Sequence, residues 1–149
     1  MRRFALIVGC VFVVGFCGCG EVVVKQTVES AQFGPHGGPI VALPAEAGFI
    51  EVVSEPVGKE GSAVIAVYFL DKALTAAMPS PPTTAKVMIE TPDKPEPIEL
   101  ELTAEAAKGV AGETRLASKP GPFQFDQLIG NVETTVAGSP FKAAFRATR

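Results

Sequence analysis

Residues 63–70 read AVIAVYFL, and the fold assignment depends on this stretch. The run is nearly all apolar and rich in β-branched residues, which is typical of a strand buried on both faces. A Gly- and Pro-containing turn precedes it, and Asp71 begins the next connection. We therefore predict a central β-strand over 63–70, with a sheet built around it.

Short apolar or alternating runs recur on both sides, separated by Gly and Pro clusters. Residues 49–53, FIEVV, place Glu51 on one face with two apolar neighbours, and residues 98–102, IELEL, place Glu99 and Glu101 outward. About eight such runs predict an all-β domain, an immunoglobulin-like β-sandwich of about 7–8 strands, with an open β-barrel as the alternative. The other predicted strands are 39–43, 85–90, 112–117, 132–137 and 141–146, the last two joined by a turn at 138–140. Helical turns are expected at 74–78 and 104–108.

The N-terminal residues, MRRFALIVGCVFVVGFCGCGE, have the form of a bacterial lipoprotein signal. A positive start precedes an apolar run of signal-peptide length, too short for a comfortable membrane span. Gly18 supplies the small residue that processing before Cys19 requires, whereas Phe16 does not supply it for Cys17. We predict a signal peptide at 1–18, a lipidated Cys19 with a tether to residue 33, and a β-domain over 34–149. A plain secretory signal and an uncleaved anchor are the alternatives.

The net charge and the positions of the cysteines exclude further classes of function. Removal of Arg2 and Arg3 leaves 11 basic against 16 acidic residues, a net charge of about −5, which argues against nucleic acid as a partner. All three cysteines lie at or before Cys19, so the mature domain has no intrachain disulfide and no thiol for catalysis or metal binding.

The segment Gly34-Pro35-His36-Gly37-Gly38 contains the only histidine of the chain. Flanking glycines permit unusual backbone angles and close approach to the imidazole ring. One interpretation is a turn before the first strand with an exposed or hydrogen-bonded histidine. The other is weak zinc or copper binding by His36, with Glu51 as a second ligand, since imidazole and carboxylate are common metal ligands.

This segment, followed by the FIEVV strand and by residues 64–71, VIAVYFLD, resembles small exported bacterial lipoproteins of unknown function that carry an HGG motif. It is also similar to a β-rich module near the N-terminus of periplasmic adaptor subunits in heavy-metal efflux systems. The resemblance covers about residues 34–71. It implies a β-sandwich module and adds weight to the metal-binding interpretation.

Other candidate chemistry in the sequence is weak. Glu99 and Glu101 form an alternating pair on a strand face that reads as solvated, and no serine has the surroundings of a nucleophile elbow. Residues 123–126, FQFD, are interpreted as an apolar plug between sheets. We expect a non-enzymatic module of the cell envelope, without a cofactor. It would be anchored to membrane lipid through Cys19, would face the periplasm or the exterior, and would act on an unidentified envelope protein. A metal-binding accessory protein is the alternative.

Overall fold

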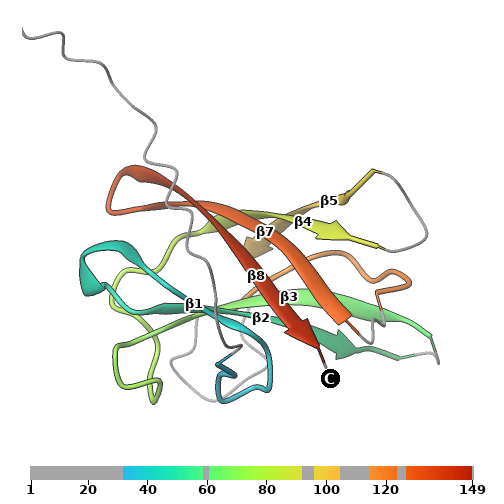
Figure 1. Ribbon diagram of the computed structural model, residues 1–149, viewed down its shortest axis with the longest axis horizontal. Helices are drawn as coiled ribbons and strands as arrows, with labels where there is room; N and C mark the ends of the chain where they lie inside the picture. Colours follow the sequence, from blue (N-terminus) through green and yellow to red (C-terminus); the bar gives the residue numbers. More distant parts are fainter. Residues whose placement is uncertain (1–31, 59–60, 92–95, 105–114, 124–126, 149) are drawn as a thin grey trace, which may run out of the picture.

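The computed structural model describes residues 32–58, 61–91, 96–104, 115–123 and 127–148, and these form a single eight-stranded antiparallel sheet (Figure 1). The strands are β1 (Ile40–Ala42), β2 (Phe49–Pro56), β3 (Ala63–Leu70), β4 (Thr84–Glu90), β5 (Ile98–Ala104), β6 (Arg115–Ala117), β7 (Gln127–Val136) and β8 (Ser139–Thr148). Their order in the sheet is β1-β2-β3-β6-β5-β4-β7-β8. A 3-10 turn at Pro44–Glu46 is the one helical element of the described chain.

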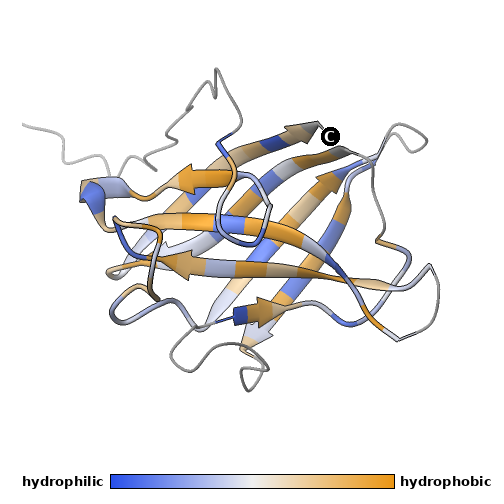
Figure 2. Cartoon of the chain, turned by 90° about the horizontal axis from the view of Figure 1, so that it is seen from below, coloured by the Kyte–Doolittle hydropathy of each residue, from blue (hydrophilic) through white to orange (hydrophobic). Residues whose placement is uncertain are grey.

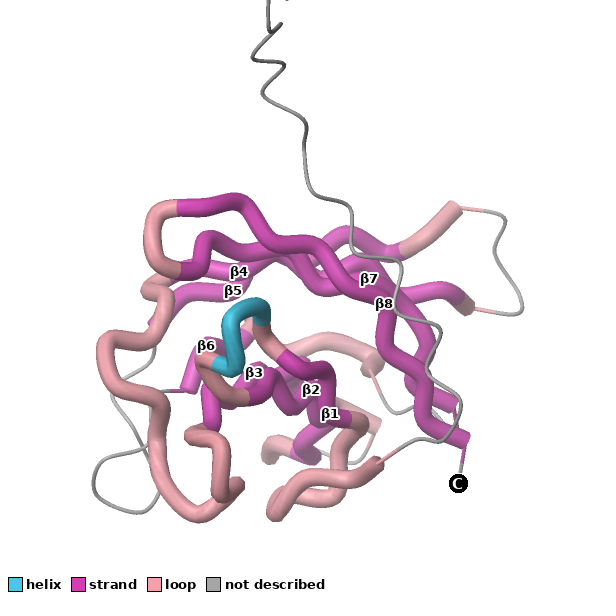
Figure 3. The backbone as a smooth tube through the Cα atoms, turned by 60° about the vertical axis from the view of Figure 1, so that its left-hand side comes forward, coloured by secondary structure: helices cyan, strands magenta, loops and turns pink. Residues whose placement is uncertain are grey.

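The sheet bends back on itself, so that β1, β2, β3 and β6 form one layer and β5, β4, β7 and β8 the other (Figures 1 and 3). Among the described residues, the ladder between the two halves consists of two residue pairs, Thr103 with Ala117 and Ala104 with Leu116. The end strands β1 and β8 approach one another, but no ladder joins them in the described part of the chain. The predicted all-β class is therefore confirmed, and the continuous sheet corresponds to the alternative of an open barrel.

Most apolar residues lie on the strands, and the inner faces of both layers bury the main core (Figure 2). Its largest fully buried members are Phe69, Phe145, Ile50, Ile65, Ile89, Leu102 and Leu116. Every residue of β3 is buried, as predicted. The outer face of β3 belongs to a second cluster, which comprises Val53, Ala66, Tyr68 and Leu70 with Phe49 and Leu74 packed against it.

The opposite layer carries a charged outer face. Glu101, Lys86, Glu133 and Lys142 are successive neighbours across four strands, so charges of opposite sign alternate. Lys86 pairs with Glu99 at 2.6 Å and Lys142 with Glu133 at 2.6 Å. Hydrogen bonding to Glu99 raises the pKa of Lys86 above its ordinary value. The solvated interpretation of the two glutamates on β5 agrees with this arrangement.

Two local predictions need correction. The β7–β8 hairpin forms, but its turn is Ala137-Gly138, with φ of 50° and 81°, which is the positive-φ pair of a type I′ turn. Residues 74–78 make no helical turn. Leu74 has a φ of 59°, and the Thr75 N–H donates to the Asp71 carboxylate at 2.9 Å, so the chain turns back. This backbone N–H lowers the pKa of Asp71. Residues 105–108 of the second expected helix lie outside the described residues.

Among the described residues, the structure contains no helix that is long and apolar enough to cross a membrane.

Candidate functional site: a turn anchored on a buried carboxylate

The GPHGG segment forms a tight turn that leads into β1. Phe33 and Pro39 form an antiparallel bridge across its base. Inside the turn the Gly34 N–H donates to the Gly38 carbonyl at 2.9 Å, and the Gly37 N–H donates to the Gly34 carbonyl at 3.0 Å. The turn lies against the outer face of β2 through its contacts with Glu51, described next.

Glu51, at the centre of β2, holds this turn. Its side chain is 0% exposed. Its Oε1 accepts the backbone N–H groups of His36 and Gly38, both at 2.9 Å, and its Oε2 lies 2.8 Å from His36 Nδ1. Since a carboxylate oxygen only accepts, Nδ1 is the donor, and the hydrogen bond fixes the orientation of the imidazole. A buried carboxylate is thus supplied with three donors by one short turn.

Each glycine of the motif has a structural reason. A Cβ at Gly34 would lie 2.4 Å from the Glu51 carboxyl carbon, and a Cβ at Gly38 would lie 2.1 Å from the Val52 carbonyl oxygen. Gly37 has open space around it but a φ of +81°, which side-chain-bearing residues rarely adopt. A side chain at Gly34 or Gly38 would therefore force the turn or Glu51 to move, whereas one at Gly37 would strain only the backbone.

The His36 ring stacks on Tyr68 of β3, with ring centroids 3.8 Å apart and planes 8° from parallel. The Tyr68 hydroxyl donates to Glu55 Oε1 at 2.5 Å, and Arg115 Nη2 of β6 donates to Glu55 Oε2 at 2.5 Å. Burial of the phenol, and then its hydrogen bond to Glu55, raise the pKa of Tyr68 well above its ordinary value. We call His36, Glu51, Glu55, Tyr68 and Arg115 the anchor cluster.

The structure brings His36 and Glu51 together, as the two predicted metal ligands require. Their relation is a hydrogen bond, however, and both Glu51 oxygens are used as acceptors. No group of three or more His, Cys, Asp or Glu side chains in the described segments is arranged to hold a metal ion. Metal binding by this pair therefore stays a prediction.

The sequence reasoning missed three members of the anchor cluster. Glu55 lies on the same face of β2 as Glu51 by strand alternation, so it could have been found from the sequence. Tyr68 could not, because the apolar run of β3 shows no alternation and the contact of Tyr68 with His36 depends on the pairing of β3 with β2. Arg115 could not either, because it pairs with Tyr68, which lies 47 positions earlier in the chain. The predicted lipidation site Cys19 lies outside the described residues, as do residues 124–126 of the predicted plug. Phe123 itself is buried in the core.

Chemically, the anchor cluster combines hydrogen bonds from the loop to Glu51, hydrogen bonds from Tyr68 and Arg115 to Glu55, and the stacking of His36 on Tyr68. Charge-assisted hydrogen bonds of this kind are strong and directional. They hold the imidazole and the turn backbone in one position on the barrel surface.

Comparisons of the chain with known proteins found no matching family model, no curated relative and no matching solved structure.

Proposed function

We propose that this chain is a lipid-anchored envelope protein whose barrel is a non-enzymatic interaction module. In this proposal the anchored turn at residues 33–38 is the surface that contacts a partner protein. Acylated Cys19 would supply the membrane attachment, since several acyl chains anchor a protein stably without a protein span.

The observation that carries the proposal is that the turn supplies the hydrogen-bond donors for the buried Glu51 carboxylate. A fully buried carboxylate is costly unless it is hydrogen-bonded, and here its partners all belong to the turn. The hydrogen bonds that compensate for the burial of Glu51 therefore also fix the shape of a surface loop. Phe33, at the base of that loop, is 47% exposed and is the exposed large hydrophobic residue of the described chain.

The metal-binding alternative uses the same two residues differently. A metal ion bound between His36 Nδ1 and Glu51 would replace the hydrogen bond to Oε2, while Oε1 could still accept the two backbone N–H groups. The pair would supply two ligands, whereas structural zinc sites have four, and the described residues offer no third His, Cys, Asp or Glu side chain beside them. This shortage of ligands favours the interaction module over the metal site.

The position of the turn fits a membrane-associated partner. Residues 19–32 precede Phe33, and an extended chain advances at most about 3.3–3.6 Å per residue, so the turn would lie within ~50 Å of the bilayer surface. A partner embedded in or attached to the same membrane is within that reach.

Photo-crosslinking in intact cells tests the proposal. A photoreactive phenylalanine analogue at position 33 should give a discrete adduct with an envelope protein, and the same analogue at Glu101 on the charged face should not. The Glu51→Gln change, which releases the turn, should weaken the adduct. Equal adducts at both positions, or none at position 33, would refute the proposed surface.

Lipidation is tested separately with an alkyne-bearing fatty acid. Labelling should survive a Cys17→Ser change and disappear with Cys19→Ser. Labelling that survives Cys19→Ser would exclude the predicted anchor.

A further inference from the structure

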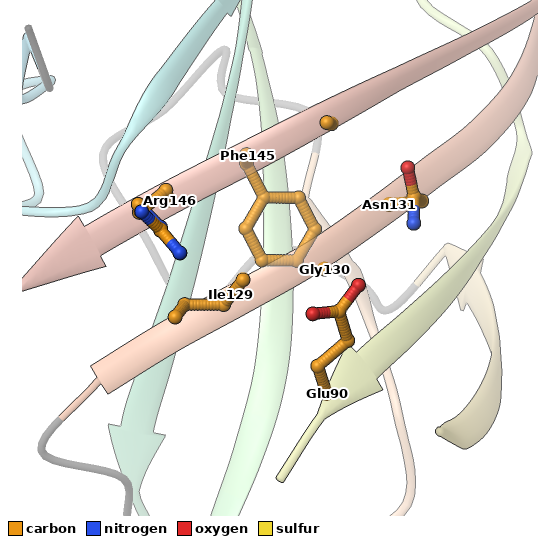
Figure 4. Close-up of a pocket in the computed structure, with 7 residues that line it drawn as sticks. Glu90, Ile129, Gly130, Asn131, Phe145 and Arg146 are labelled. Carbon is orange, nitrogen blue, oxygen red and sulfur yellow. The ribbon is translucent and has the colours of Figure 1, made fainter. Parts of the chain in front are cut away.

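A second surface feature lies on the opposite layer, away from the anchor cluster. Strands β4, β7 and β8 border a hollow of about 250 Å³. Its lining comprises Gly130 and the side chains of Glu90, Ile129, Asn131, Ala144, Phe145 and Arg146 (Figure 4). Ligand pockets for drug-sized molecules run from roughly 300 to 1,000 Å³, so this hollow suits a smaller molecule.

The two charged residues of the hollow lie on either side of Ile129. In the sheet register Glu90 pairs with Ile129 and Ile129 pairs with Arg146, so the three residues form one row across three strands. Neighbouring strands lie about 4.8 Å apart, which separates the backbones that carry the two charges by about 10 Å. Figure 4 shows the Glu90 carboxylate turned toward Gly130, with Arg146 on the other side of Ile129.

These charges differ from their neighbours on the same face. Lys86 with Glu99 and Lys142 with Glu133 form direct ion pairs. Within the described segments, neither Glu90 nor Arg146 makes such a pair, because the interposed Ile129 keeps them apart. A ligand with a positive charge at one end and a negative charge at the other would complement a carboxylate and a guanidinium separated in this way.

The floor of the hollow is rigid. A Cβ at Gly130 would lie 2.0 Å from the Met88 carbonyl oxygen and 3.0 Å from Phe145 Cζ. Strands β4 and β7 are therefore in close contact at this point, and the buried Phe145 ring supports Gly130 from the core. The spacing of the charged residues is set by this backbone.

We propose that the hollow binds a short peptide with free termini, about three residues long. Three extended residues span about 10 Å, the separation of the two charged strand positions. The peptide ammonium would meet Glu90, and its carboxylate would meet the Arg146 guanidinium, which can bind a carboxylate through two parallel hydrogen bonds. The Asn131 amide would bind a peptide group, and Ile129 would contact an apolar side chain. This site is independent of the turn at residues 33–38.

Amide NMR of the full chain in detergent micelles tests the site, with trialanine as the probe. Trialanine should shift the Gly130 and Asn131 amide signals in a saturable way. N-acetyl-trialanine, which lacks the ammonium, and trialanine amide, which lacks the carboxylate, should each bind about fivefold more weakly, the factor for about 1 kcal/mol of an exposed ion pair.

Two variants test which charged residue binds each end of the peptide. Glu90→Gln should remove the preference for trialanine over its acetylated form, and Arg146→Gln should remove the preference over its amide. Glu101→Gln, on the same sheet face, should leave binding unchanged. The absence of shifts up to about 10 mM trialanine would overturn the proposal. End preferences that persist in both variants would also overturn it.

Discussion

The sharpest prediction concerns Glu51→Gln, which preserves the size of the side chain and removes its charge. A glutamine presents one acceptor oxygen and one NH₂ donor. Either the two backbone N–H groups of His36 and Gly38 or the imidazole Nδ1 then faces a donor instead of an acceptor. If the amide oxygen stays on the two backbone N–H groups, the NH₂ can donate to Nδ1 once the imidazole proton moves to Nε2, and all three contacts become neutral hydrogen bonds without charge assistance.

The magnitude follows from the burial and the number of partners. Hydrogen bonds to charged groups contribute about 1.5–3 kcal/mol each, against about 0.5–1.5 kcal/mol for neutral ones. With three contacts at 2.8–2.9 Å and a side chain 0% exposed, we expect a loss of about 3 kcal/mol of unfolding free energy. That corresponds to a fall in Tm on the order of 10 °C or more.

Urea unfolding of the full chain measures the effect, with Glu99→Gln as the matched control. Glu99 is 57% exposed and paired with Lys86, and its change should cost no more than about 1 kcal/mol. A His36→Ala change and the double variant complete a cycle, in which the two effects should be strongly non-additive because the groups are in contact. If Glu51→Gln unfolds at the same urea concentration as Glu99→Gln, the carboxylate does not anchor the turn.

Three further predictions concern local geometry. Gly38→Ala should lower the free energy of unfolding by more than about 2 kcal/mol, because its Cβ would meet the Val52 carbonyl oxygen. Gly37→Ala is strained only in φ and should lower it by about 1 kcal/mol. Equal losses in urea unfolding would contradict the close approach of Gly38 to β2. Burial raises the pKa of Tyr68, the only tyrosine, so the unfolded chain ionises first and stability should fall as the pH rises past about 10. Phenolate absorbance that appears at the ordinary tyrosine pH in the native protein would refute this. Ala137→Asn should stabilise the hairpin by about 0.5 kcal/mol, since asparagine tolerates positive φ; a lower Tm would argue against the type I′ turn.

The strands were the most predictable part of the structure, because their patterns are local. The unbroken apolar run of β3 and the alternation of β4 and β5 are visible in the sequence, and the burial of each strand follows them. The sheet order was not predictable, because β6 lies between β3 and β5 through non-local pairing. The hairpin turn was predicted at the wrong residues because Pro140 is a typical turn residue. In the structure Pro140 pairs with Thr135 in the ladder between β7 and β8.

The candidate site was predicted in part for the same reason. His36 and Glu51 were singled out by residue type, and the structure places them 2.8 Å apart. Their relation was not predictable, because three donors converge on Glu51 only when the glycines bring the turn against β2. The stacking of His36 on Tyr68 depends on the pairing of β2 with β3.

Zinc titration of the full chain by calorimetry tests most directly whether His36 and Glu51 anchor the turn or bind a metal. If Glu51 is the acceptor for the turn, the wild type and His36→Ala should give the same small heats, with no saturable binding assigned to the imidazole. Micromolar zinc binding that is present in the wild type and lost in His36→Ala would contradict the interaction module and would make metal handling the leading function.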